Sequence, residues 1–178
     1  MEVVLNILCF RSGTDPELLT QILLSLTNLA VLPDWHHHLP PLLPSLLDNL
    51  TQSSFNNRSL DSVKYQSSRL LVNLTCNDDN IRHLLQARCQ TPIANIVSRC
   101  IPEDQLLRNV TFLSNVYCSA IRLGLVDMKD PRDVAPNTLL SGMVNAQNII
   151  LTEVQWMMDN HKNSDIRMQA RKISVALS

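Results

Sequence analysis

A four-residue pattern of leucine, any residue, asparagine and an apolar residue recurs along the chain at nearly constant spacing. It ends three apolar-striped segments at Asn28, Asn73 and Asn115, and these asparagines are 45 and 42 residues apart. Apolar side chains before Asn73 recur every three or four residues, which is the spacing of one face of an α-helix. A period of about 40–47 residues with helical patterning is typical of helical solenoids, whose repeats must stack to bury their apolar faces.

A fourth and degenerate copy closes the chain. Residues 169–177 follow the order of residues 66–74, but Ala176 stands where the asparagine is expected. The interval from Asn115 to Ala176 is 61 residues, and its glycine, proline and charged run within residues 123–135 indicate an insertion. Few glycines and many leucines favour helix over sheet. The sequence therefore predicts an all-α fold, a right-handed α-solenoid of about four repeats.

The solenoid is expected to form a single domain over residues 1–178, with repeats ending near residues 31, 75, 118 and 177. The apolar stretch at residues 2–10 is interpreted as the remnant of a preceding helix. Its abrupt start predicts self-association through exposed solenoid ends. Five apolar residues are predicted to be buried between the layers: Leu26, Leu71, Leu74, Leu113 and Ile173.

Local signals place the breaks between helices. Prolines within residues 33–44 predict short turns, and the Ser, Asn and Gln content of residues 51–61 predicts a polar loop. Residues 136–159 are expected to form a helix in two pieces. The dipeptide Ser164-Asp165 is expected to cap the last helix.

Composition narrows the function classes. Charged residues make up 17% and the net charge is −1, so nucleic acid is not an expected partner. Apolar runs are far shorter than the roughly 20 residues that cross a bilayer, so no transmembrane segment is expected. The five cysteines are odd in number and form no C-x-x-C pair, which indicates a reducing compartment such as the cytoplasm.

The sequence carries no catalytic signature. It has no glycine-rich phosphate loop, no G-x-S-x-G, no H-E-x-x-H and no paired carboxylates with a supporting base, so we expect no enzyme and no cofactor. The three consecutive histidines at positions 36–38 are interpreted as a solvated turn rather than a metal site. Consecutive side chains point in different directions, and no further Cys/His pair completes four ligands.

Three long segments that end in Leu-x-Asn-apolar, each followed by a polar turn and shorter helices, resemble armadillo repeats, whose third helix carries an asparagine on the concave face. Segments 70–78, 84–87 and 160–166 are similar to the divergent armadillo domain of the X-linked armadillo-containing and G-protein-coupled-receptor-associated sorting proteins. This resemblance implies an adaptor in mitochondrial distribution or receptor sorting. It implies a cytoplasmic location or one at the mitochondrial outer membrane surface, through an anchor absent from this chain.

The three asparagines are the candidate binding residues. Each amide has two donors and two acceptor sites, so a row of them can hold an extended peptide by its main chain. Four further candidates lie one or two turns back on the same face: Gln66, Arg69, Arg108 and Thr111. The alternative is that each asparagine bonds the adjoining turn or a neighbouring helix.

These residues predict a non-enzymatic adaptor that binds a protein or peptide segment in a concave groove. The competing interpretation is a structural subunit of a larger assembly that uses its convex face or its ends. If the asparagines bind a partner, changing Asn73 and Asn115 to alanine is expected to weaken capture while leaving the melting temperature nearly unchanged, because exposed polar groups contribute little to folding.

Overall fold

The computed structural model describes residues 15–51, 58–90, 92–126 and 134–178. These residues form helices and no extended strand, with one isolated antiparallel bridge between Arg88 and Thr138. The apolar stretch at residues 2–10, and the self-association predicted from it, lie outside the described residues. The insertion predicted at residues 123–135 is described only in part.

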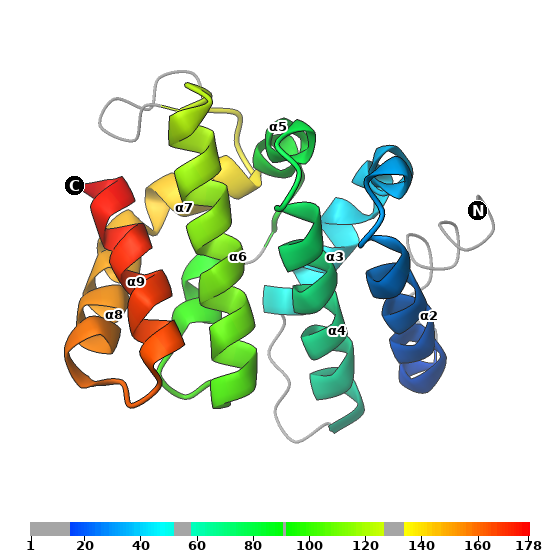
Figure 1. Cartoon of the computed structure of the whole chain (residues 1–178), viewed down its shortest axis with the longest axis horizontal. Coiled ribbons are helices and arrows are strands. Elements are labelled where there is room, and N and C mark those ends of the chain that lie inside the picture. Colours follow the sequence, from blue (N-terminus) through cyan, green and yellow to red (C-terminus); the bar gives the residue numbers. More distant parts are fainter. Residues whose placement is uncertain (1–14, 52–57, 91, 127–133) are drawn as a thin grey trace.

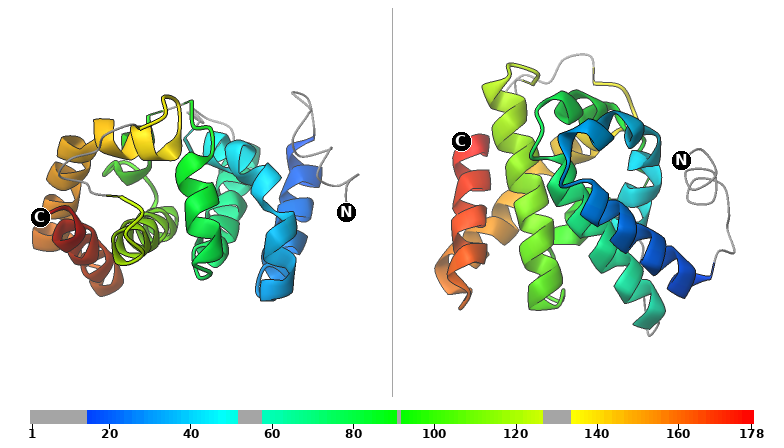
Figure 2. Two further views of the ribbon diagram at one scale, coloured as in Figure 1. Left: turned by 90° about the horizontal axis from the view of Figure 1, so that it is seen from above. Right: turned by 45° about the vertical axis from the view of Figure 1, so that its right-hand side comes forward.

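Four long helices lie side by side in one row: α2 (Pro16–Leu29), α4 (Arg58–Leu74), α6 (Glu103–Arg122) and α9 (Ser164–Leu177) (Figure 1). The other helices stand behind or between them, and of these only α8 is as long as α2 and α9: η1 (Pro33–His38), η2 (Pro40–Leu42), α3 (Leu43–Thr51), α5 (Asp79–Gln86), η3 (Ile93–Val97), α7 (Leu139–Asn145) and α8 (Gln147–Asn160). Seen from above, the long helices form the inner row of a shallow arc (Figure 2, left). The prediction of an all-α solenoid is confirmed. We call the exposed side of this row the inner face.

Prolines and caps define the helix ends. Asp15 caps α2, since its Oδ1 accepts the backbone N–H of Glu17 at 3.1 Å and a proline occupies the first turn. Pro44 lies in the first turn of α3, whereas Pro33, Pro40 and Pro41 lie in short 3₁₀ turns, as predicted. They do so because a proline in a helix interior removes a hydrogen bond and clashes with the preceding turn.

Two predicted helix starts were wrong. Part of the polar loop predicted over residues 51–61 is helical, because Thr51 belongs to α3 and α4 already begins at Arg58. The cap of α9 is Asn163 rather than Ser164-Asp165, since the Asn163 side chain accepts the N–H groups of Asp165 and Ile166. Asparagine is as good a cap as serine, so local preference alone could not select the residue.

One hydrophobic core runs the length of the described chain between the two rows. The five residues predicted to be buried there are at most 3% exposed, which confirms the stripe assignment: Leu26, Leu71, Leu74, Leu113 and Ile173. Ser67 is also fully buried, and its hydroxyl accepts the Asn49 amide of α3 at 3.2 Å. A small side chain at this position lets α3 and α4 approach closely while its oxygen stays bonded.

A buried polar network joins the first two repeats, and it corrects the interpretation of the histidine run as a solvated turn. His36 is only 4% exposed. Its Nε2 donates to the Ala30 carbonyl at 2.8 Å, and its Nδ1 accepts from the Asn80 amide at 2.9 Å. The same amide donates to the Leu74 carbonyl at 2.9 Å. A carbonyl can only accept, so the network assigns the proton of a neutral ring to Nε2.

Tyr117 on α6 is fully buried, and its hydroxyl has no hydrogen-bond partner within the described residues. Burial raises the pKa of its phenol, because the phenolate is the form that loses solvation. The folded state therefore keeps Tyr117 neutral above about pH 10, where an unfolded tyrosine ionises. The free energy of unfolding is therefore at its full value below about pH 10. It falls as the pH rises from there to the pKa of Tyr117 in the folded state.

We expect Tyr117→Phe to raise the free energy of unfolding at pH 7 by about 1 kcal/mol, because it removes an unbonded buried hydroxyl. The free energy of unfolding of the parent protein should fall by about 1.4 kcal/mol per pH unit above about pH 10, and the variant should lack this fall. Urea unfolding at several pH values measures both effects, with Tyr65→Phe as the control for loss of a phenol. A destabilised Tyr117→Phe would show that the hydroxyl has a partner.

Candidate protein-binding surface

Two of the three candidate asparagines lie at successive interfaces between the long helices. Asn73 on α4 donates its side-chain amide to the Thr27 carbonyl of α2 at 3.0 Å. Asn115 on α6 repeats this arrangement, donating to the Thr75 hydroxyl at 2.9 Å. Both asparagines are half-buried, whereas Asn28 at the end of α2 is exposed. Two of the three amides therefore bridge neighbouring repeats, which is the structural role held as the alternative.

This geometry changes the expected effect of the alanine variants. The expectation of an unchanged melting temperature rested on exposed side chains, and that premise is wrong for Asn73 and Asn115. We expect each alanine variant to lose about 0.5–1.5 kcal/mol of unfolding free energy, the net value of a typical hydrogen bond. The two losses should add in the double variant, because the bonds lie at separate interfaces.

Urea unfolding of the single and double variants measures these losses. Asn28→Ala is the matched control, and at an exposed site its effect should stay within about 0.5 kcal/mol. If Asn73→Ala lowers the free energy of unfolding no more than Asn28→Ala does, the result contradicts a bridging role for Asn73. A loss of partner capture in the destabilised variants would not by itself identify binding residues.

The other four candidates form two pairs on neighbouring helices. On α4, the Arg69 guanidinium donates to the Gln66 side chain at 3.2 Å. On α6, Arg108 and Thr111 are half-buried and lie three residues apart, on the same helix face as Asn115. The Thr111 hydroxyl bonds its own helix, donating to the Leu107 carbonyl at 2.7 Å. Of these four residues, Arg108 presents the charge least engaged by neighbouring side chains.

A groove of about 810 Å³ lies between the N-terminal halves of α4 and α6. Gln66 lines it, together with Lys64 and Asp61 from α4 and Asp104 and Gln105 from α6. Burial lowers the pKa of Lys64, and the Asp61 carboxylate opposes that shift. The groove thus carries both signs of charge and selects no single ligand class.

The sequence patterns did not predict a second groove, which we call the α6–α9 groove. It has a volume of about 560 Å³ and runs between the C-terminal halves of α6 and α9. From α6 it is lined by Cys118, Ile121 and Arg122, and from α9 by Met168, Arg171, Lys172, Val175 and Ala176. The signal that could have revealed it is Ala176, the alanine at the position of the repeated asparagine.

The charged residues among the described lining of the α6–α9 groove are all cationic. Arg122 forms an ion pair with Asp78, which lowers the pKa of that carboxyl and raises the pKa of the guanidinium. Arg171 and Lys172 are exposed, and neither forms an ion pair with another described residue. The groove therefore keeps two cations available to a ligand.

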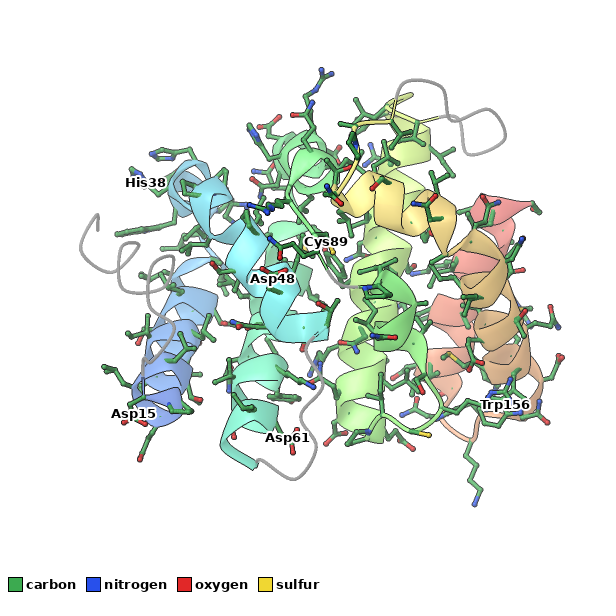
Figure 3. All side chains as sticks on the ribbon, turned by 180° about the vertical axis from the view of Figure 1, so that it is seen from behind. Asp15, His38, Asp48, Asp61, Cys89 and Trp156 are labelled. Atoms are coloured by element: carbon green, nitrogen blue, oxygen red, sulfur yellow. The ribbon has the colours of Figure 1, made fainter. Side chains whose placement is uncertain are left out.

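Within the ranges that the structure describes, no three His, Cys, Asp or Glu side chains come together as a metal site would require. His37 and His38 are exposed, and His38 projects away from the helices (Figure 3). Over the same ranges, no helix combines the length and the apolar character needed to cross a bilayer.

Comparison with known proteins identifies the family. The sequence profile described as Armadillo-like matches residues 5–128. A solved structure of an engineered protein aligns over 99% of this chain and 97% of its own, with 13% identity and a TM-score of 0.41. No curated protein matches the chain. The profile spans well over half of the sequence and the described part folds as an all-α solenoid, so the chain belongs to the Armadillo-like family.

Proposed function

We propose that this protein is a non-enzymatic adaptor that binds a segment of a partner protein along the inner face of its long helices. Family membership supports a role in protein interaction generally. The observation that carries the proposal is the inner face itself, where polar candidates on α4 and α6 continue into an apolar, cationic groove beside α9. A stacked solenoid needs neither feature for its own core.

The setting that we propose is mitochondrial distribution or receptor sorting, in the cytoplasm or at the mitochondrial outer membrane surface. It rests on the sequence resemblance alone. Proximity labelling in cells that express the full-length protein tests this setting and supplies the partner list. Partners confined to another compartment would contradict it.

The binding surface is tested with charge reversals on the inner face. Arg69→Glu combined with Arg108→Glu should remove most labelled partners, because both cations lie on half-buried positions of the long helices. The matched control is Arg82→Glu combined with Lys162→Glu, which changes the net charge equally at exposed positions on α5 and in the turn before α9. Circular dichroism must show that both variants stay folded.

A structural subunit is the competing function, and one observation favours it. Val31 and Leu32 are 70% and 54% exposed at the end of α2, as a docking end would require. Under that function, Val31→Asp with Leu32→Asp removes the partners while the inner-face variant keeps them. That pair of results would overturn the adaptor proposal.

A further inference from the structure

We propose that the α6–α9 groove binds an acidic amphipathic helix of the partner protein. This inference rests on the proposed adaptor function and names the part of the inner face and the chemistry that make the contact. It follows from three properties of the groove: the missing asparagine, the apolar floor and the cationic rim.

The groove is open because the fourth repeat lacks the bridging asparagine. At the two preceding interfaces, Asn73 and Asn115 extend an amide across to the neighbouring repeat. Ala176 occupies the corresponding position of α9 and lines the groove. An alanine side chain ends at its first carbon, so no amide crosses from α9 to α6 at this point. The interface keeps its packing in the core and loses its polar cover on the inner face.

The floor of the groove is apolar and accessible. Ile121, Met168 and Val175 are 40%, 49% and 70% exposed. Met168 and Val175 are seven residues apart on α9, which places them two helical turns and about 10 Å from each other. Side chains of this kind are normally covered, and Met in particular adapts its shape to a partner surface.

The rim of the groove determines the charge of the occupant. Among the described residues, Arg171 and Lys172 have no ion-pair partner beside the apolar floor, and no described Asp or Glu lines the groove. A cationic partner would be repelled, whereas carboxylates flanking an apolar stripe would complete the ion pairs. The occupant is therefore acidic as well as apolar.

The apolar floor also selects a helix over an extended strand. An extended peptide leaves its backbone N–H and C=O groups to be satisfied by the groove, and the described lining has no amide or carboxylate side chain to accept from those N–H groups. A helix bonds its own backbone and presents apolar anchors at i, i+3 or i+4, and i+7, which fits the two-turn floor. An acyl chain would need fuller enclosure than an open groove offers.

A designed probe tests the proposal. It is a fluorescein-labelled peptide of about four helical turns, with leucine at i, i+4 and i+7 and glutamate at flanking positions. Fluorescence polarisation with the full chain should show saturable binding that weakens in about 1 M salt, where charges are screened within about 3 Å. A peptide with lysine in place of glutamate should not bind, and neither should one with serine in place of leucine.

Variants locate the site. Arg171→Glu with Lys172→Glu should weaken binding of the acidic peptide at least about tenfold, whereas the equally charged control Arg82→Glu with Lys162→Glu should not change it. Ala176→Asn should weaken it about tenfold as well, because an amide then covers the apolar floor. Bound peptide should slow maleimide labelling of Cys118, with the exposed Cys76 and Cys100 as internal references.

Three results would overturn the proposal: parental affinity in both groove variants, unprotected Cys118 in the complex, or binding of anionic phospholipid vesicles without binding of the peptide. The adaptor proposal is judged separately by the inner-face variant at Arg69 and Arg108, which lies outside this groove. If that variant loses its partners while the groove variants keep them, the groove assignment fails and the adaptor function stands.

Discussion

Leu71→Asp is expected to leave the protein unfolded at 25 °C. Leu71 lies on α4 with no exposed surface, in the core shared with α2 and α6. Loss of the leucine packing alone costs about 2–5 kcal/mol, as in large-to-small core substitutions. A buried carboxylate without a partner adds several kcal/mol, even if it takes up a proton to become neutral. Together these costs match the whole stability of a typical domain, about 5–15 kcal/mol.

Far-ultraviolet circular dichroism and urea unfolding measure the outcome. Val31→Asp introduces the same charge at a position that is 70% exposed, and it should keep the parental spectrum. Leu71→Ala should give an intermediate, folded but destabilised protein. A folded Leu71→Asp protein with a parental midpoint would show that α4 does not form the centre of the core.

Asn80→Ala is expected to cost about 2–4 kcal/mol of unfolding free energy, a large effect for a polar side chain. Asn80 is 5% exposed and donates both amide hydrogens, one to His36 and one to the Leu74 carbonyl. Alanine would leave His36 Nδ1 without a donor and the Leu74 carbonyl with only the long 3.4 Å bond from the Asn77 N–H, and a buried acceptor that cannot reach water costs about 1–3 kcal/mol. The substitution should also weaken the contact between the first and second described repeats, because His36 bonds the Ala30 carbonyl as well as Asn80.

A double-mutant cycle isolates this network. His36→Ala and Asn80→Ala should each be costly, and the double variant should cost less than their sum by about 0.5–3 kcal/mol, because both remove the same bond. His37→Ala, at an exposed neighbouring position, should change stability by no more than about 0.5 kcal/mol. Additive losses in the cycle would mean that His36 and Asn80 act independently.

The sequence by itself was enough for the fold class and for the buried faces. Apolar spacing of three and four residues identified the stripes of α4 and α6, and their central leucines are fully buried in the structure. This works because a helix turns by a constant angle per residue, so spacing alone reports which side chains share a face. The short turns at the prolines after residue 32 and the two-piece helix between residues 136 and 159 were predictable for equally local reasons.

Only the tertiary structure decided what the polar residues do. His36 and Asn80 form a hydrogen bond although they are 44 residues apart, and nothing in the local sequence pairs them. The same is true of Asn73 and Thr27, 46 residues apart. A hydrogen bond requires a donor and an acceptor within about 3 Å, so its partner depends on how whole helices stack. The α6–α9 groove exists for that reason too, because Ala176 opens a surface only where another helix lies beside it.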